Sequence, residues 1–220
     1  MSSQKTKIIL VDDHPLVREW LTSLIHQQPD LIVCGEAETA PMALKLMASA
    51  KPEVAIVDIS LKGGSGLELI KDIKISHPEV AVIVLSMHDE RLYAERALRA
   101  GARGYIMKRE TARNVIAAIR RVLEGKLYLS EKLSAWFAEK FVDGPASAFG
   151  SPVEQLSDRE LEVFQLLGEG QETRQIAESL HLSMKTVQAY CSRIKEKLKL
   201  ANATELLREA IRWNESRQEQ

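Results

Sequence analysis

Apolar residues gather in five short runs along the first half of the chain, and four of these runs end in a charged or hydroxyl side chain. The central run, residues 54–57, stops abruptly at Asp58. A continuous apolar run of strand length is typical of a strand that is buried on both faces of a parallel sheet. Because ligands of open α/β sheets bind beyond the carboxyl ends of such strands, the pattern predicts that Asp58 lies at the ligand-binding edge.

The four strand ends form an ordered series of an acid pair, an acid, a hydroxyl and an ammonium group. In chain order they are Asp12 and Asp13 after residues 7–11, Asp58 after 54–57, Ser86 after 80–85 and Lys108 after 103–107. Taken singly, each of these residues is better explained as a helix cap or a surface group. Three carboxylates at one edge repel one another unless a positive charge lies among them, and oxygen ligands with few other protein donors suit Mg²⁺. We therefore expect a magnesium site here.

Helical spacing between the runs indicates the class of fold. Apolar residues recur three and four positions apart, as in Leu21, Leu24 and Ile25. Strands that alternate with amphipathic helices are typical of βαβ units, and a run at residues 31–34 brings the number of strands to five. The sequence predicts a doubly wound α/β domain with five parallel strands in the flavodoxin-like order 2-1-3-4-5.

The glycine-rich stretch at residues 63–66 invites interpretation as a nucleotide site. It reads Gly-Gly-Ser-Gly and lacks the Gly-Lys-Ser/Thr ending of a phosphate-binding loop in nucleotide-hydrolysing proteins. We interpret it as a turn that lets the backbone pass the site beside Asp58.

The alternating pattern ends after a last amphipathic helix at residues 111–124. Residues 127–141 have apolar and aromatic side chains at helical spacing, which predicts a linker helix whose apolar face packs against another surface. Residues 143–152 have a turn-forming composition and predict a flexible tether. We expect three segments: a first domain at 1–125, a linker helix with its tether at 126–155, and a second domain at 156–220.

The second domain opens with a helix-start signal and contains a tight turn between two helices. Ser157 and Glu160 have the spacing of a capping box ahead of an apolar series. A short helix at 173–180, a turn at 181–183 and a longer helix at 184–198 follow. This arrangement is typical of a helix-turn-helix, in which the second of the two helices reads DNA. The prediction is a small all-α domain of four helices.

The helix at 184–198 has two different faces. One is apolar and expected to face the core: Val187, Cys191, Ile194 and Leu198. The other is polar and basic: Lys185, Gln188, Ser192, Lys195 and Lys199. Between residues 185 and 199 there are five basic residues and one acidic residue, a modest electrostatic footprint for nucleic acid. Because a solvated amphipathic helix has a similar pattern, it is the preceding turn that favours DNA binding.

The last helix has a wider apolar stripe than one small domain needs. Leu206, Ala210 and Trp213 lie on one side of it, and Leu207 and Ile211 flank them. The flanking residues are candidates for a contact between two copies of the chain.

Composition narrows the functional class only a little. Among 220 residues there are 30 basic and 31 acidic ones, so net charge does not indicate a polyanionic partner. The fractions of hydrophobic residues, 45%, and charged residues, 28%, are ordinary for a globular protein in water. Cys34 and Cys191 lie in different expected domains without metal-ligand spacing, which favours a reduced, cytoplasmic setting. No apolar run has the length of a signal-peptide core or a membrane span, so no membrane association is expected.

From residue 7 to about residue 124, the ordered series resembles the receiver domain of response regulators. The residues that match that family's acidic pair, phosphate-accepting Asp, switch hydroxyl, switch aromatic residue and invariant Lys are, in this order, Asp12 and Asp13, Asp58, Ser86, Tyr105 and Lys108. The resemblance implies that a sensor histidine kinase phosphorylates Asp58, with Mg²⁺ held by the three acids. Leu61 and Lys62 stand where the family often has Met-Pro, a change expected to affect loop stiffness and reaction rates but not the chemistry.

The second domain resembles the LuxR-type four-helix DNA-binding domain. The motifs that match in order and spacing are residues 156–160, 176–177, 182–183, 185–187 and 197–198. The resemblance implies base contacts by Lys185, Gln188, Ala189 and Ser192, and phosphate contacts by Lys195 and Lys199. Tyr190 and residues 199–203 depart from the usual pattern, which affects the DNA sequence that is read.

A receiver followed by this domain resembles the NarL/FixJ family of response regulators. The resemblance implies a phosphorylation-activated transcription regulator of a two-component system, not an enzyme, that binds double-stranded DNA and forms a homodimer on activation. RNA polymerase is a further possible partner. One alternative is a phosphatase-like α/β hydrolase with an Asp nucleophile, which is disfavoured because no spare motif supplies a second catalytic acid. Another is a degenerate receiver on a constitutive DNA-binding module, which the intact series disfavours.

Overall fold

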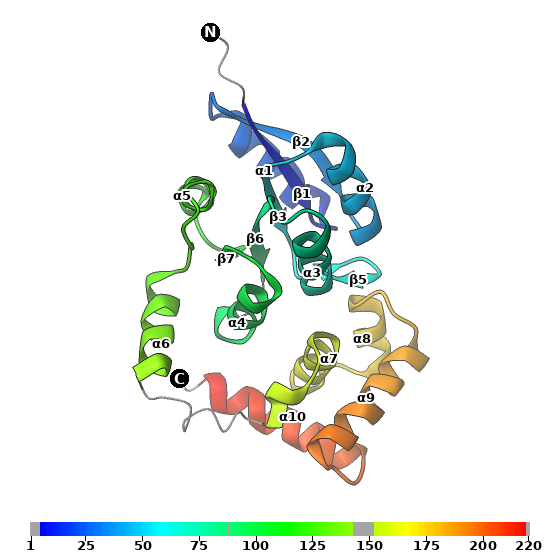
Figure 1. The fold of residues 1–220 in the computed structure, drawn as a ribbon. Helices are drawn as coiled ribbons and strands as arrows, with labels where there is room; N and C mark the ends of the chain where they lie inside the picture. The colour runs from blue at the N-terminus through cyan, green and yellow to red at the C-terminus, as the bar shows by residue number, and fades with distance from the viewer. Residues whose placement is uncertain (1–4, 88, 143–151, 219–220) are drawn as a thin grey trace. The chain divides into compact units, whose positions relative to one another are not determined.

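The computed structural model of the protein describes residues 5–87, 89–142 and 152–218. The chain divides into two compact units, Met1–Glu139 and Lys140–Gln220. The first unit is a sheet flanked by helices, and the second is helical (Figure 1). The expected tether at 143–152 falls outside the described residues except for its last position.

Five parallel strands form the sheet of the first unit. Their bounds are β1 Thr6–Val11, β2 Leu31–Ala37, β3 Val54–Val57, β6 Ala81–Ser86 and β7 Gly104–Met107. They lie in the order β2-β1-β3-β6-β7, which confirms the predicted doubly wound topology (Figure 1). Every residue of β3 and β7 is buried, because helices cover both faces of the sheet.

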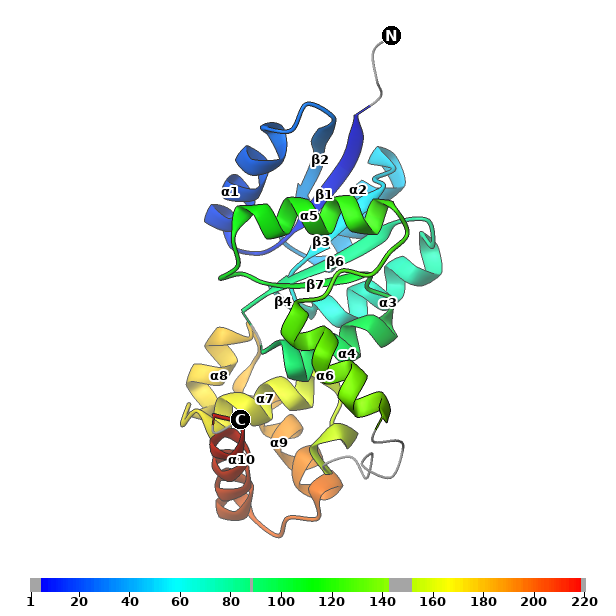
Figure 2. The same ribbon diagram turned by 90° about the vertical axis from the view of Figure 1, so that its left-hand side faces the viewer.

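Helices α1 Pro15–His26 and α5 Ala112–Leu123 cover one face of the sheet, and α2 Ala40–Ala50, α3 Gly66–Ser76 and α4 Glu90–Ala100 cover the other (Figures 1 and 2). The core beneath α1 and α5 consists of buried side chains from helices and strands alike: Ile8, Leu10, Leu21, Ile25, Ile56, Ile83, Val115 and Ile119. The sequence did not single out α4. Its buried residues are one tyrosine and three alanines, which leave a weak apolar signal.

A small antiparallel hairpin, β4 Ser60–Leu61 with β5 Gly64–Ser65, connects β3 to α3. Gly66 follows it, and its amide donates to the carbonyl oxygen of Ile59 at 2.7 Å. A Cβ atom at position 66 would lie 1.9 Å from the carbonyl oxygen of Asp58, so only glycine fits there. The glycine-rich stretch is therefore a turn that packs directly against Asp58.

The linker helix begins four residues later than the sequence predicts. Helix α6 spans Glu131–Val142, and residues 127–130 are not helical. Tyr128 instead pairs with the edge of the sheet: its amide donates to Arg103 at 2.9 Å, and its carbonyl accepts from the amide of Tyr105 at 3.1 Å. The sheet edge thus satisfies backbone groups that would otherwise need a helix, and α6 starts only beyond this point.

The described part of the second unit contains a short 3-10 helix and four α-helices. They are η1 Pro152–Gln155, α7 Asp158–Gly168, α8 Thr173–Ser179, α9 Met184–Leu198 and α10 Ala203–Gln218. The predicted capping box is present, since Ser157 accepts from the Glu160 amide and the Glu160 side chain accepts from the Ser157 amide. A Cβ atom at Gly168 would lie 2.4 Å from the carbonyl oxygen of Ala210, so this glycine permits the close approach of α7 and α10.

The two thiols of the chain are both free, and they lie in different units. Burial raises the pKa of Cys34 and of Cys191, which keeps both protonated and weakly reactive at neutral pH. Among the helices that the structure describes, none is long and apolar enough to span a membrane.

Candidate functional site

The predicted strand-end residues of the first unit meet at the carboxyl edge of the sheet. The ammonium group of Lys108 lies 2.7 Å from Asp12 Oδ2 and 2.7 Å from Asp58 Oδ2. Asp12 and Asp58 are only 2% and 3% exposed, so both carboxylates are almost withdrawn from water. A cation between two buried carboxylates offsets the repulsion that would otherwise oppose their burial. Lys108 therefore holds the acid cluster together.

Burial is the main reason that the pKa of Asp58 is raised to about 6. The Lys108 ammonium opposes the shift, and the Asp12 carboxylate adds to it. For Lys108 itself, burial disfavours the charged form, but Asp58 and Asp12 outweigh burial and the pKa of Lys108 is raised. At neutral pH Asp58 is thus ionised but poorly hydrated, a state that suits a nucleophilic carboxylate.

The acid cluster has the donor set of a divalent-cation site. Ligand atoms of Asp12, Asp13, His14 and Asp58 all lie within 4.8 Å of one another. Nδ1 of the exposed His14 lies 2.8 Å from Asp13 Oδ1 and 3.2 Å from Asp12 Oδ1. Carboxylate oxygens from three residues are the ligands that Mg²⁺ takes in proteins. The residues present therefore fit a divalent cation.

The acid pair does not cap the following helix. The N-cap residue of α1 is His14, and its side chain makes no capping hydrogen bond. Asp12 Oδ1 accepts from the backbone amide of His14 at 2.9 Å, one residue ahead of the helix. The interpretation of these acids as simple helix caps is therefore wrong, and their carboxylates are directed to the cluster.

Ser86 and Tyr105 are both fully buried, and their side chains are hydrogen-bonded to each other. Burial raises the pKa of the Tyr105 hydroxyl, and the bond with Ser86 opposes this shift only in part. The resemblance to receiver domains implies that Tyr105, as the switch aromatic residue, turns from an exposed to a buried position on activation. In the structure the Tyr105 side chain is in the buried position.

The start of the linker is tied to the residues around Tyr105. The Tyr105 amide donates to the carbonyl of Tyr128, as described above. Ser130 Oγ donates to Glu90 Oε2, at the first residue of α4, at 2.9 Å and accepts from the Leu133 amide at 3.0 Å. Leu133 is fully buried. The beginning of α6 is thus bonded to both β7 and α4, a connection that no local sequence pattern reveals.

In the second unit, α9 carries the predicted DNA contacts on its surface. The residues concerned, all exposed except the half-buried Lys195, are Lys185, Gln188, Ala189, Ser192, Lys195 and Lys199. Ser183 begins the helix by accepting from the Thr186 amide at 3.1 Å. Val187 and Ile194 are fully buried on the opposite face, as predicted. The turn before α9 and its exposed first turns have the form that a groove-reading helix needs.

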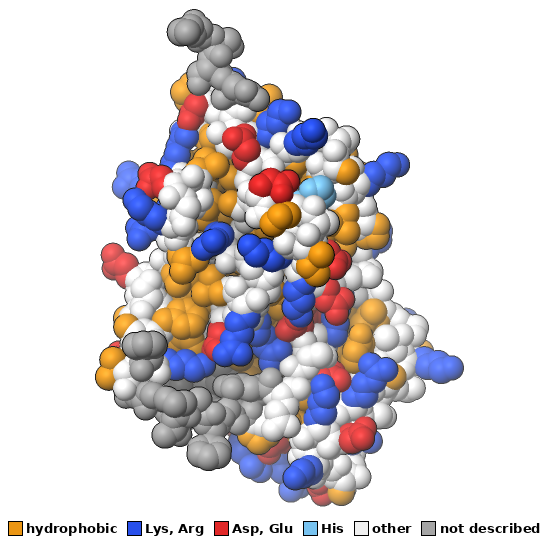
Figure 3. All heavy atoms as spheres, viewed as in Figure 1, with side chains coloured by type: hydrophobic (Ala, Val, Ile, Leu, Met, Phe, Trp, Pro, Cys, Tyr) orange, Lys and Arg blue, Asp and Glu red, His pale blue; other side chains and the backbone are white. Residues whose placement is uncertain are grey.

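An ion pair between the exposed Lys197 and the buried Glu160 joins the end of α9 to the start of α7. Lys197 Nζ lies 2.6 Å from Glu160 Oε2 and donates to the carbonyl of Gln155 at 3.2 Å. Burial opposes ionisation of Glu160, but its bonds with Lys197 and Ser157 outweigh burial and lower its pKa. Lys197 therefore has a structural role. On the face shown in Figure 3, basic and acidic side chains are interspersed, in keeping with the balanced net charge.

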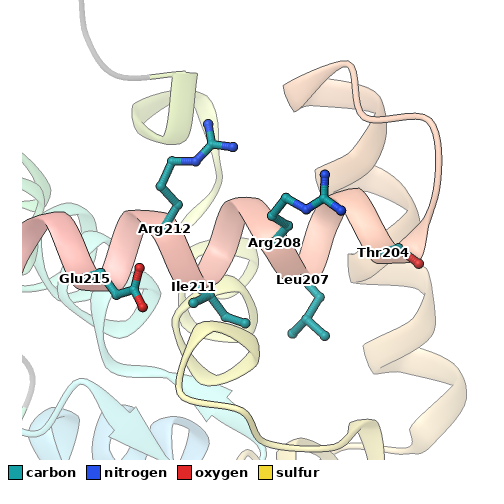
Figure 4. Close-up of a pocket in the computed structure, with 6 residues that line it drawn as sticks. All are labelled: Thr204, Leu207, Arg208, Ile211, Arg212 and Glu215. Carbon is teal, nitrogen blue, oxygen red and sulfur yellow. The ribbon is translucent and has the colours of Figure 1, made fainter.

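Helix α10 leaves part of its apolar stripe uncovered. Leu206 and Ala210 are buried, whereas Leu207 and Ile211 are 42% and 37% exposed. The latter two project to the same side of α10 (Figure 4). They border an open hollow whose other lining residues are Thr204, Arg208, Arg212 and Glu215.

A buried arginine of the first unit lies outside the predicted signature. Arg18 of α1 is only 9% exposed and donates to the carbonyl oxygen of Asp12 at 2.6 Å. It precedes the buried Leu21 and Ile25 by three and seven positions, so it lies on the apolar face of its own helix. A charged residue on such a face was the signal that could have drawn attention to it.

The first unit thus has the sheet and the acid, hydroxyl and lysine set of a receiver, and the second has the helix-turn-helix of a DNA reader. Residues 8–120 match the family of the response regulator receiver domain, and residues 154–210 match the bacterial regulatory proteins of the luxR family. The chain belongs to the two-component response regulators that combine these domains, the NarL/FixJ family. It is a phosphorylation-dependent DNA-binding regulator, and proteins of this family are generally not enzymes.

Known proteins of similar sequence extend over almost the whole chain. The oxygen regulatory protein NreC of Staphylococcus epidermidis is 34% identical over 211 residues, which cover 94% of this chain and 97% of that protein. NreC of Staphylococcus haemolyticus is 35% identical over 210 residues, with the same coverage. A structure of RcsB from Salmonella typhimurium has 27% sequence identity and a TM-score of 0.66, and covers 94% of this chain and 97% of that one.

A second RcsB structure has DNA in it. RcsB from Salmonella enterica serovar Typhimurium, bound to promoter rprA in the presence of the phosphomimetic BeF3-, has 28% sequence identity and a TM-score of 0.61. The match covers 93% of this chain and 98% of that one. The similarity therefore includes both the receiver and the helical domain.

Proposed function

We propose that Asp58 accepts the phosphoryl group and that α9 reads DNA. The observation that carries the proposal is the buried bridge from Lys108 to Asp58 and Asp12, because it leaves a poorly hydrated carboxylate beside a fixed cation. The phosphoryl donor is a sensor histidine kinase, and the protein acts in the cytoplasm. The receiver comprises residues 1–125, the linker and tether 126–155, and the DNA-binding domain 156–220.

The chemistry is a single in-line displacement at phosphorus. A carboxylate oxygen of Asp58 forms a bond to phosphorus while the bond to one nitrogen of the donor imidazole breaks. Because the other ring nitrogen of the donor carries a proton, the products are an acyl phosphate and a neutral imidazole. Lys108 pairs with a phosphoryl oxygen as a point charge. When bound, Mg²⁺ would be held by Asp12, Asp13 and Asp58 and would neutralise the phosphoryl charge.

Ser86 connects the acceptor to the switch residue. Once Asp58 is phosphorylated, the Ser86 hydroxyl can donate to a phosphoryl oxygen instead of to Tyr105, and its oxygen can then accept from the Tyr105 hydroxyl. Phosphorylation then favours the buried position of Tyr105. The backbone of Tyr105 is bonded to Tyr128, and Glu90 at the start of α4 is bonded to Ser130. A shift of β7 or α4 that accompanies the movement of the Tyr105 side chain therefore reaches the start of α6.

Removal of divalent cations is expected to stop phosphorylation, because three acids and a dianionic phosphoryl group cannot share the site without a compensating cation. The measurement is labelling by acetyl phosphate in buffer with a chelator, followed by the addition of excess Mg²⁺, which should restore it. Circular dichroism before and after chelation controls for unfolding. Undiminished labelling in chelator would rule out the metal assignment.

The partners follow from the two domains. We assign double-stranded DNA to the exposed face of α9 and a second copy of the chain to the uncovered part of α10, and RNA polymerase is a further partner to be tested. The RcsB complex with promoter DNA supports the first of these assignments. The intact acid cluster supports control by phosphorylation over constitutive binding.

Gln188 and Lys199 are expected to differ in the kind of DNA contact that they make. A glutamine can bond an adenine edge at two points, so Gln188→Ala should cost about 1 to 3 kcal/mol on the cognate site and relax the preference at one base pair. Lys199→Ala should weaken binding to all sequences alike and reduce the salt slope by about 1.

Both variants are measured on a cognate site and on a scrambled one at several salt concentrations. The cognate site is first found by mapping DNA bound in cells. Lys197→Ala is not a suitable control because Lys197 is part of the domain structure, whereas Arg174→Ala on α8 removes only an exposed ion pair with Glu178. An equal loss of affinity for both DNAs in Gln188→Ala would show that Gln188 is not a base reader.

A further inference from the structure

The guanidinium group of Arg18 lies directly behind the acid pair. Its Nη1 atom donates to the carbonyl oxygen of Asp12 at 2.6 Å. The backbone amide of Asp12 donates to the carbonyl of Ala37 at 3.1 Å. The backbone of Asp12 is therefore fixed on both sides, by the end of β2 at its amide and by Arg18 at its carbonyl.

The other nitrogens of the guanidinium contact two acids at the end of β2. Nε lies 3.3 Å from Glu36 Oε2, and Nη2 lies 3.1 Å from Glu38 Oε1. Thr22 Oγ1 donates to Glu36 Oε1 at 2.9 Å and so holds that carboxylate in place. Two carboxylates offset the charge of Arg18. Arg18 therefore orients the backbone carbonyl of Asp12 and does not neutralise the Asp12 carboxylate. Lys108 is different, since its ammonium contacts the carboxylates of the cluster themselves.

The bond to the Asp12 carbonyl controls more than one residue. A peptide unit is planar, so a fixed Asp12 carbonyl also fixes the amide of Asp13 and the directions in which both side chains leave the backbone. Groups that orient metal ligands in this way affect ion affinity without contacting the ion. A buried carbonyl that loses its donor must also seek another partner, which would rotate the peptide.

We infer that Arg18 is a positioning residue for divalent-cation binding at the phosphorylation site. It acts through the peptide that joins Asp12 to Asp13, and it affects the affinity for the ion and not the attack by Asp58. The inference rests on the proposed function of these two acids as ligands.

The test compares three variants in labelling by acetyl phosphate over a range of Mg²⁺ concentrations. Arg18→Met keeps most of the side-chain volume and loses all donors, and the half-saturating Mg²⁺ concentration should rise about tenfold. The rate at saturating Mg²⁺ should stay within about twofold of the wild-type rate. Arg18→Lys keeps one charged donor group, so its half-saturating Mg²⁺ concentration should lie between those of wild type and Arg18→Met. Arg18→Lys serves as the test if Arg18→Met does not fold. Thr22→Val removes the bond to Glu36 but leaves the Asp12 carbonyl bonded, so it should behave as wild type.

Direct binding of Mn²⁺, followed by the electron paramagnetic resonance signal of the free ion, separates affinity from reactivity. Arg18→Met should bind Mn²⁺ about tenfold more weakly while its circular dichroism spectrum stays native. An unchanged Mn²⁺ affinity would overturn the inference, and so would an equal loss of affinity and of saturated rate in a variant that stays folded. Wild-type protein that neither binds Mn²⁺ nor becomes labelled would instead contradict the proposed function itself.

Discussion

Asp58→Asn is expected to abolish phosphoryl labelling by acetyl phosphate and by the cognate kinase. The neutral amide of Asn has no carboxylate oxygen to attack phosphorus. Labelling is measured with a radioactive donor and by intact mass. Asp72→Asn, on the exposed surface of α3, is the matched control and should be labelled as wild type. Label that persists in Asp58→Asn would show that another residue is the acceptor.

The same substitution should stabilise the protein at neutral pH in the absence of divalent cations. Burial raises the folded-state pKa of Asp58 from 3.8 to about 6, so folding favours the protonated carboxyl. That contribution is fully present below about pH 4 and is lost as the pH rises through about 6. The loss amounts to about 3 kcal/mol at full ionisation. Asn resembles the protonated form of Asp58. The free energy of unfolding of the variant should therefore exceed that of the wild type by up to about 3 kcal/mol at pH 7.5, with no difference near pH 4.

Denaturant titrations of both proteins at the two pH values measure this difference. Far-UV circular dichroism reports the unfolding of the α/β unit, which contains the sheet. Asp72→Asn should show no pH-dependent gain. Equal stabilities of Asp58→Asn and wild type at pH 7.5 would mean that the ionised Asp58 is better solvated or better paired than its burial indicates.

Polar substitution of Leu207 and Ile211 is expected to prevent the pairing of two copies through α10. Each side chain is about two-fifths exposed, so its remaining apolar surface is worth about 1 to 2 kcal/mol on burial. A two-fold symmetric contact contains both residues twice, so the double variant Leu207→Gln, Ile211→Gln should weaken association by about 4 kcal/mol or more, roughly a thousandfold. The domain itself should stay folded, because Leu206 and Ala210 supply the buried part of the stripe.

Sedimentation of the phosphorylated protein and the cooperativity of its DNA binding both test this result. Arg174→Gln on α8 is the control, since Arg174 lies outside the hollow that Leu207 and Ile211 border and the substitution should leave association nearly unchanged. Thermal unfolding of the double variant checks the fold. Dimers of unchanged strength in the double variant would exclude this helix as the contact.

The sheet and its ligand edge could be predicted because both depend on local sequence. Residues 54–57 are apolar at every position, which requires burial on both faces, and the carboxyl ends of parallel strands share one edge. Asp12 and Asp58 therefore had to lie near each other. The helix-turn-helix was equally local, since Ser157 and Glu160 cap α7 and Ser183 caps α9. The sequence alone determined these features, and the family resemblance rests on the same residues.

Only the tertiary structure decided which of these groups bond to one another. Lys108 lies 50 residues from Asp58 in the chain and contacts both Asp58 and Asp12, a geometry that no spacing rule gives. Tyr128 lies in a helical pattern but pairs with the sheet edge, because the neighbouring strand offers hydrogen bonds that compete with those of a helix. Arg18 likewise serves a carbonyl on another element. Each choice depends on a balance of about 1 kcal/mol per hydrogen bond between partners that meet only after folding, so local sequence does not rank them.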